Sequence, residues 1–190
     1  MIIDKGAPDS AARASAVLRQ GKVAVIPTDT VYGFSGIVPE TEGILRRIKG
    51  REAGKPFIRL IARPEDVFLY SAEPVPREIV ALWPAPFTLL VAAAGGKTLA
   101  FRCPGDVWLR SVIAETGKPL FSTSVNRAHK LPLTAIDNII REFGSEVPLI
   151  VYSADCRAGL PSTILDISGG EPRIVRQGDF RLPPYIGVRP

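Results

Sequence analysis

The segment at residues 23–26 restricts the fold most, because it reads Val-Ala-Val-Ile with no polar residue between. A strand with one solvated face alternates apolar and polar side chains, whereas a strand covered on both faces does not. An amphipathic, Ala-rich segment over residues 9–20 precedes it, and Gly21 is suited to end that segment as a helix. The pattern predicts a strand over residues 22–27 that is buried inside an α/β fold.

Helical and strand-like segments alternate along the rest of the chain. Further helices are predicted over residues 41–49, 64–71, 76–82, 107–116 and 135–143, and further strands over residues 56–62, 87–93, 99–103, 120–124, 149–152, 163–167 and 173–175. A loop is expected over residues 28–37, and irregular structure over the Pro-rich residues 182–190. Glycine-rich turns at 93–97 and 169–170 predict two antiparallel hairpins. We therefore expect an α/β sandwich around a twisted sheet of mixed parallel and antiparallel strands.

The length of 190 residues suits one core, so we expect a single domain over residues 1–190 with its core at about 9–180. No stretch reaches the roughly 18 apolar residues of a membrane span, and the N-terminus lacks the pattern of a signal peptide. Cys103 and Cys156 are isolated and are expected to be reduced thiols. These features predict a cytoplasmic protein without a membrane partner.

The formal net charge is +5 and the sequence pI is about 9.5. Such a charge favours anionic partners, namely nucleotides, RNA or an acidic protein. Lys and Arg are scattered along the chain and do not form runs, so solubility alone remains an alternative explanation.

Polar segments occur where the apolar runs begin or end. They are P-T-D-T-V-Y-G at 27–33, K-G-R at 49–51 with Lys55 beyond it, S-T-S-V-N at 122–126, and P-S-T-I-L-D at 161–166 followed by I-V-R at 174–176. Arg102 adds a cation inside an apolar strand, where it usually faces a cleft or a carboxylate. If these cations, hydroxyls and amide converge, they form a site for one small, highly anionic ligand.

Each polar segment also has a purely structural interpretation. Thr28 and Asp29 suit a turn, the K-G-R cations suit a helix C-terminus, and S-T-S-V-N suits an ordinary polar turn. Other chemistries lack their residues. His129 is the only histidine and is expected on a surface loop, and no group of side chains has metal-ligand spacing. G-G-K-T at 95–98 is not a phosphate loop, because Val91 stands where that pattern needs glycine.

The polar segments resemble those of the YrdC/TsaC family of threonylcarbamoyl-adenylate synthases. The matching motifs, in the family's order, are P-T-D-T-V-Y-G, K-G-R, W-P-A-P-F-T-L, F-R-C-P, S-T-S-V-N, P-S-T-I-L-D and I-V-R-Q-G. The resemblance covers residues 15–180 and is to the short bacterial form of the family. The resemblance implies a YrdC-like fold and a nucleotidyltransferase that makes threonylcarbamoyl-AMP and pyrophosphate from L-threonine, bicarbonate and ATP, with Mg²⁺ accompanying ATP and no tightly bound metal site.

The resemblance also implies roles for individual residues. The catalytic set would be Lys49, Arg51, Ser124 and Asn126; the threonine site would be Thr30, Tyr32, Arg102, Ser124 and Ser162; the ATP site would be Arg51, Lys55, Thr98, Asn126, Thr134 and Arg176. The product would pass to a separate transferase complex that modifies an adenosine of tRNA, and the basic surface would suit contact with tRNA.

The chain departs from the family's pattern at three places. Glu52 follows K-G-R where the family often has Pro, Leu60 replaces a His that contacts threonine in some relatives, and S-V-N-R-A-H replaces S-A-N followed by Ser-Gly. Two other classes of function remain as alternatives. One is a double-stranded RNA- or tRNA-binding module without catalysis, and the other is a carbamoyl-transfer module like that of hydrogenase maturation.

Overall fold

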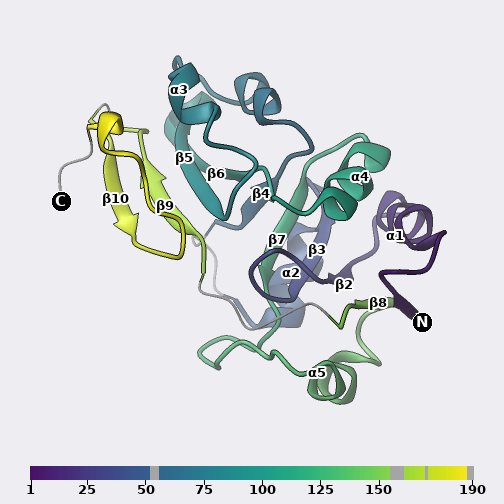
Figure 1. The fold of residues 1–190 in the computed structure, drawn as a ribbon. Helices are drawn as coiled ribbons and strands as arrows, with labels where there is room; N and C mark the ends of the chain where they lie inside the picture. The colour runs from purple at the N-terminus through teal and green to yellow at the C-terminus, as the bar shows by residue number, and fades with distance from the viewer. Residues whose placement is uncertain (52–55, 155–160, 170, 188–190) are drawn as a thin grey trace.

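The computed structural model describes residues 1–51, 56–154, 161–169 and 171–187 (Figure 1). Within these residues ten strands form one sheet, in the order β1-β8-β2-β3-β7-β4-β6-β5-β9-β10. The strands are β1 (Ile2–Asp4), β2 (Ala24–Ile26), β3 (Gly33–Ile37), β4 (Ile58–Leu60), β5 (Phe87–Ala93), β6 (Lys97–Arg102), β7 (Leu120–Ser124), β8 (Leu149–Tyr152), β9 (Thr163–Asp166) and β10 (Arg173–Arg176). The α-helices are α1 (Ser10–Arg19), α2 (Glu42–Lys49), α3 (Arg77–Val80), α4 (Val107–Thr116) and α5 (Ile136–Phe143), and the 3-10 turns are η1 (Pro64–Leu69), η2 (Ala94–Gly96) and η3 (Pro184–Ile186).

The sheet is mixed, as the sequence predicts. Strand pairs β1–β8, β8–β2, β4–β6 and β5–β9 are parallel, and the remaining five pairs are antiparallel. Both predicted hairpins are confirmed. Strands β5 and β6 are joined through Gly95 and Gly96, whose φ values of 73° and 69° lie in the left-handed region. Strands β9 and β10 pair antiparallel, with a shift of register between Ile174 and Arg176.

The structure differs from the sequence predictions at three places. The expected loop over 28–37 contains strand β3, which pairs with both β2 and β7. Its sequence Gly-Phe-Ser-Gly-Ile has little intrinsic β-propensity, so its neighbours in the sheet decide its conformation. The short edge strand β1 was missed, since it holds its place by pairing with β8, far along the chain. The helix predicted over residues 64–71 is the shorter 3-10 helix η1, Pro64–Leu69.

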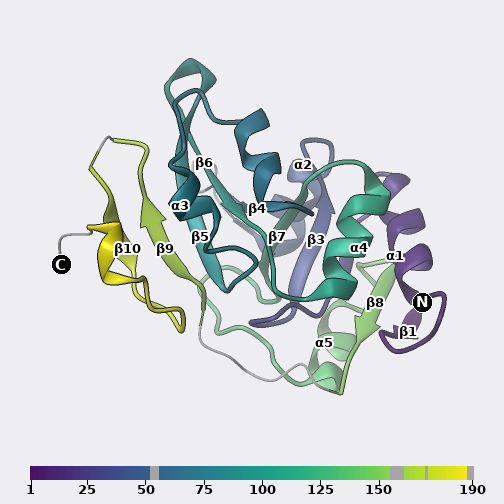
Figure 2. The same cartoon turned by 45° about the horizontal axis from the view of Figure 1, so that its top comes forward.

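Helices cover both faces of the sheet near the N-terminal strands (Figures 1 and 2). On one face α1 and α4 lie side by side and bury Leu18 and Val112 against the strands. On the other face α2 and α5 bury Leu45 and Phe143. Strand β2 points Val25 into one core and Ile26 into the other, which explains why apolar and polar residues do not alternate along it.

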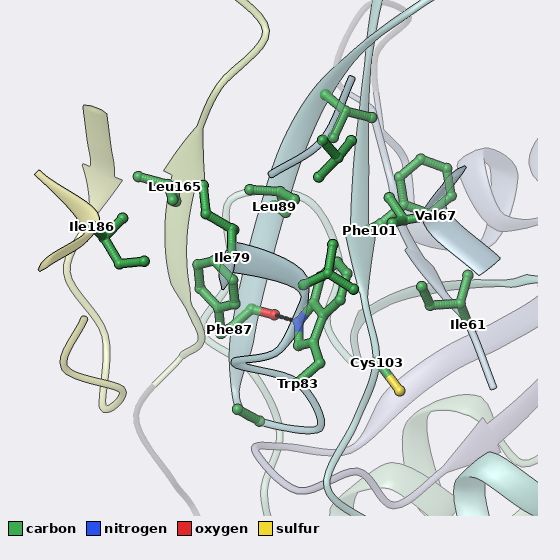
Figure 3. Packing of buried hydrophobic residues seen from close by; sticks show 14 residues of the cluster. Ile61, Val67, Ile79, Trp83, Phe87, Leu89, Phe101, Cys103, Leu165 and Ile186 are labelled. Atoms are coloured by element: carbon green, nitrogen blue, oxygen red, sulfur yellow. Dashed lines mark hydrogen bonds between the residues drawn. The ribbon is translucent and has the colours of Figure 1, made fainter. Parts of the chain in front are cut away.

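A third core covers β5, β6 and β9 on one face only (Figure 3). It is built around Trp83, whose indole Nε1 donates to the carbonyl oxygen of Phe87 at 2.7 Å. Strand residues of this core include Leu89 and Phe101, and register places Phe101 on the face of the sheet that α2 and α5 cover. Side chains that alternate with these core residues along β5, β6 and β9 therefore point to the opposite face, in a part of the sheet that α1 and α4 do not cover.

Candidate active site

A cavity of about 560 Å³ lies on that opposite face, where α1 and α4 do not cover the sheet. Strand periodicity places Leu90, Ala100 and Ile164 in its floor, since each neighbours a residue of the third core. The described residues that line it are Thr28, Thr30, Val31, Gly33, Arg51, Pro56, Phe57, Ile58, Thr88, Leu90, Ala100, Arg102, Ser122, Thr123, Ser124, Pro132, Pro161, Ser162, Ile164, Val175 and Arg176. Residues from every polar segment of the sequence thus meet at one concavity of ligand size.

Gly33 lies at the wall of this cavity, where a larger residue would press on its neighbours. A Cβ atom there would lie 3.0 Å from the Ser122 hydroxyl oxygen and 3.4 Å from the Thr123 carbonyl oxygen. Strands β3 and β7 pair Gly33 with Ser124, so the glycine lets the hydroxyls of β7 stand against the backbone of β3.

Lys49 is a buried cation at the edge of the site. It is the last residue of α2, which Gly50 ends with a φ of 63°, and it is 4% exposed. Its Nζ donates to the Ser124 carbonyl oxygen and to Asn126 Oδ1, both at 2.6 Å. Burial, together with the charge of Arg51, lowers the Lys49 pKa to about 8. Because its hydrogen-bond acceptors are neutral, no carboxylate of the described residues offsets the charge of this ammonium, and it can still attract an anionic ligand.

Arg51 follows on the cavity side of Gly50. Its guanidinium lies 5.0 Å from the centre of the Phe57 ring, and its Nη2 donates to the Pro56 carbonyl oxygen at 3.1 Å. Its Nε is buried and has no hydrogen-bond partner within the described parts of the chain. Burial, and then the charge of Arg46, lowers the Arg51 pKa. Arg51 therefore has donor capacity left for a ligand.

Arg102 closes the end of strand β6 and forms an ion pair with Asp29. Their side chains are 6% and 17% exposed. Arg102 Nη1 also donates to the Thr30 hydroxyl at 3.2 Å, and Asp29 Oδ2 accepts from the Gly105 backbone N–H at 2.9 Å. Burial, and then the charge of Arg176, lowers the Arg102 pKa to about 10.

Of the two turn roles predicted in P-T-D-T, one is confirmed and one is wrong. The Thr28 hydroxyl accepts from the backbone N–H groups of Thr30 and Val31, both at 3.2 Å, which is a local turn. Asp29 instead holds Arg102, since the opposite charge lies close across the sheet end. The expectation that Arg102 faces a carboxylate and a cleft is confirmed on both counts.

Arg176 and Ser162 come together on the hairpin of β9 and β10. Arg176 Nε and Nη2 donate to the Ser162 carbonyl oxygen at 3.0 and 2.8 Å, and Nη2 lies 3.2 Å from the Ser162 hydroxyl. Burial lowers the Arg176 pKa. The Ser162 hydroxyl is 2.8 Å from that of Thr88, a cavity residue that sequence reasoning missed. The sequence does contain a signal for this residue, because Thr88 is the polar residue in the otherwise apolar run Phe87–Ala93.

Ser124 and Asn126 complete the group around Lys49. The Ser124 hydroxyl donates to Asn126 Oδ1 at 2.6 Å, and Asn126 Nδ2 donates to the carbonyl oxygens of Arg127 and Lys130. Three of the four predicted catalytic residues therefore form one hydrogen-bonded set, and the fourth, Arg51, lines the cavity beside Ser124.

The other predicted residues lie apart from this set. Tyr32 is 3% exposed in the α2–α5 core, and its hydroxyl contacts the Ser153 backbone. Thr98 is exposed but shares the sheet face of Ala100, with its hydroxyl 3.3 Å from that of Ser168. Thr134 is exposed just before α5. None of these three is among the described residues that line the cavity, and Lys55 lies outside the described residues.

The three family departures have different outcomes. Leu60 is buried in the α1–α4 core, at 1% exposure. Glu52 lies outside the described residues. His129, in the altered segment after Asn126, is exposed with a φ of 63°. In the described parts of the chain no three His, Cys, Asp or Glu side chains gather as a metal site.

Together these features define an α/β protein with a cavity lined by three arginines and by hydroxyl side chains from several strands. The Sua5/YciO/YrdC family model, described as telomere recombination, matches residues 16–178, and the chain belongs to this family.

Named relatives agree with this assignment. The chain is 30% identical over 185 residues to the threonylcarbamoyl-AMP synthase of Pyrococcus abyssi, covering 89% of this chain and 54% of that protein. It is 28% identical to the Vibrio vulnificus protein of the same name, covering 85% of this chain and 94% of that protein. The crystal structure of P. abyssi Sua5 complexed with L-threonine superposes with a TM-score of 0.83 at 25% identity, covering 94% of this chain and 57% of that chain. The chain thus spans about half the length of the P. abyssi relative.

No helix among the described residues is both long enough and apolar enough to cross a bilayer.

Proposed function

We propose that this chain is a threonylcarbamoyl-AMP synthase, which joins L-threonine, bicarbonate and ATP and releases pyrophosphate. The observation that carries the proposal is that Arg51, Arg102 and Arg176 line one cavity, while Lys49 lies behind its wall with Nζ 3.3 Å from the hydroxyl of the lining residue Ser124. Within the described parts of the chain, Arg102 alone of these cations pairs with a carboxylate. The relatives' shared name supports this activity over an RNA-binding module without catalysis.

Threonine would bind at the Arg102 end of the cavity. A guanidinium can hold a carboxylate with two parallel hydrogen bonds, and Arg102 Nε is free of partners among the described residues. The hydroxyls of Thr30, Ser124 and Ser162 line the same space and could hold the amino acid's polar groups. Tyr32 would act from behind this wall, by fixing the chain that carries Thr30.

ATP would place its phosphates between Lys49, Arg51 and Arg176. Asn126 would reach the nucleotide through the same hydrogen-bonded set, and Thr98, Thr134 and Lys55 would contact it outside the cavity. Mg²⁺ would arrive on the phosphates, because the described lining residues include no carboxylate to hold it.

The chemistry needs little proton transfer by the protein. The threonine amine adds to CO₂ derived from bicarbonate and loses a proton, which gives a carbamate anion. A carbamate oxygen then attacks the α-phosphorus, a P–O bond forms, and the bond to pyrophosphate breaks. The main barrier is the approach of two anions, and Lys49, Arg51 and Arg176 would offset it and stabilise the charge on pyrophosphate.

The test is pyrophosphate release by the purified chain. We expect release that requires ATP, threonine and bicarbonate together, with a product of the mass of threonylcarbamoyl-AMP. Substitutions Lys49→Ala and Arg51→Ala should each lower the rate by about 10²-fold or more. A matched control is Arg141→Ala, an exposed arginine of α5 that contacts Asn138. Release without threonine, or wild-type rates in both site variants, would contradict the proposal.

We further propose that the chain acts in the cytoplasm and passes its product to a separate transferase that modifies tRNA. The net charge of +5 would favour a contact with RNA there.

A further inference from the structure

Arg127 begins the segment where this chain departs from the family pattern, and its side chain joins three parts of the fold. Its guanidinium forms ion pairs with Glu142 at 3.3 Å and with Glu146, on and just beyond α5. It also lies 4.4 Å from the centre of the Phe143 ring. Arg127 Nη1 donates at 2.6 Å to the carbonyl oxygen of Ile48, in the last turn of α2. It is not among the described residues that line the cavity.

The contact with Ile48 fixes the backbone that carries Lys49. The last carbonyls of a helix lack partners within the helix, and a cation is favoured there. The next residue adds a second tie, since the Ala128 N–H donates to the Lys49 carbonyl oxygen at 2.7 Å. The end of α2 is therefore fastened to residues 127–128 on both sides of the Lys49 peptide.

The same segment sets the orientation of the Asn126 amide. Asn126 Nδ2 donates to the carbonyl oxygens of Arg127 at 2.8 Å and Lys130 at 2.6 Å. Its Oδ1 is thereby turned toward Lys49 Nζ and the Ser124 hydroxyl. A reversed amide would present two N–H donors to an ammonium, which is unfavourable.

We propose that Arg127 is a positioning residue for Lys49 and Asn126, holding α2, residues 127–130 and α5 in the arrangement that the reaction uses. This inference rests on the function proposed above. Arg127 acts through these two residues and touches no substrate. Its planar guanidinium reaches a carbonyl, two carboxylates and a ring at once, which a lysine ammonium cannot do.

The experiment compares Arg127→Ala and Arg127→Lys with Arg141→Ala, which removes a neighbouring arginine of α5. The first measurement is the NMR spectrum of the Asn126 side-chain amide without substrates. We expect the amide protons of wild type and Arg141→Ala to be shifted and slow to exchange. Arg127→Ala keeps the backbone carbonyls that the amide contacts but releases residues 127–130 from α2 and α5, so the amide protons should shift and exchange faster than in wild type, with Arg127→Lys between.

The second measurement is the pH profile of pyrophosphate release. We expect kcat of Arg127→Ala to fall by up to about 10²-fold, because small displacements of catalytic groups have such effects. The alkaline limb of the profile should move to lower pH, since a displaced Asn126 Oδ1 would stabilise the Lys49 ammonium less while Arg51 still repels it. A role limited to stability would lower the melting temperature and leave this limb in place.

Wild-type amide signals and an unmoved alkaline limb in Arg127→Ala would overturn the proposal. If Arg127→Ala does not fold, Arg127→Lys and the double variant Glu142→Gln/Glu146→Gln decide by the same two measurements. A wild-type chain that releases no pyrophosphate would overturn the proposed function alone, because the NMR measurement needs no substrate.

Discussion

Replacing Lys49 with methionine should change how the stability of the protein depends on pH. Lys49 is 4% exposed, and its pKa in the folded protein is about 8 against an ordinary value of 10.5. Between these two values the unfolded chain binds more protons than the folded one, so stability rises as pH rises. Below pH 8 both states are protonated, and the folded state carries the full desolvation cost.

The size of this effect follows from the two pKa values. A displacement from 10.5 to about 8 corresponds to about 3 kcal/mol, at about 1.4 kcal/mol per pH unit. We therefore expect the free energy of unfolding of wild type, minus that of Lys49→Met, to rise by about 3 kcal/mol between pH 7 and 11. Methionine also removes the hydrogen bonds that Lys49 donates to the Ser124 carbonyl and to Asn126 Oδ1, but that cost does not vary with pH.

The assay is urea denaturation followed by tryptophan fluorescence, in reductant, at each pH. Trp83 is 5% exposed and should report unfolding. Lys130→Met, at an exposed lysine, measures the effect of removing a surface lysine. A polyphosphate ligand should reduce the rise, since it compensates the buried charge. A difference between wild type and Lys49→Met that stays constant across the pH range would refute our view of Lys49 as a desolvated ammonium.

Two further predictions concern the site and a third concerns Cys103, in the third core. ATP binding at pH 8 should be accompanied by uptake of as much as about half a proton, because a bound phosphate raises the Lys49 pKa from about 8. Calorimetry in two buffers of different ionisation enthalpy measures this uptake, and a value of zero would contradict the prediction. Arg102→Lys should raise KM for threonine about 10-fold or more and leave KM for ATP nearly unchanged, whereas Arg176→Met should raise KM for ATP and leave KM for threonine nearly unchanged. Initial-rate kinetics measure both constants. Equal effects on both substrates would contradict separate threonine and ATP ends of the cavity. Cys103 is fully buried and burial raises its pKa to about 11, so iodoacetamide should modify it far more slowly in the folded than in the urea-unfolded protein; peptide mass spectrometry checks this, and equal rates would disprove it.

The sequence by itself determined most of the elements and several of the residues that line the cavity. The run at residues 23–26 predicted a buried strand because every side chain in it is apolar, and Gly50 marked the end of α2 because only glycine adopts φ of 63° without strain. The motif residues Arg51, Arg102 and Arg176 do meet at one cavity. These features are local, or they concern chemistry that a residue type carries wherever it lies.

Only the tertiary structure decided which partners these residues have. Asp29 suits a turn by its neighbours in sequence, yet it pairs with Arg102, which lies beside Thr30 although 72 residues separate the two. Strand β3 has a sequence that favours a loop, and pairing with β2 and β7 on both sides makes it a strand. In the sequence, Arg127 is visible only as a departure from the family motif. Its contacts with α2 and α5 exist only once both helices are packed. Contacts between distant segments depend on the path of the whole chain, which no local pattern encodes.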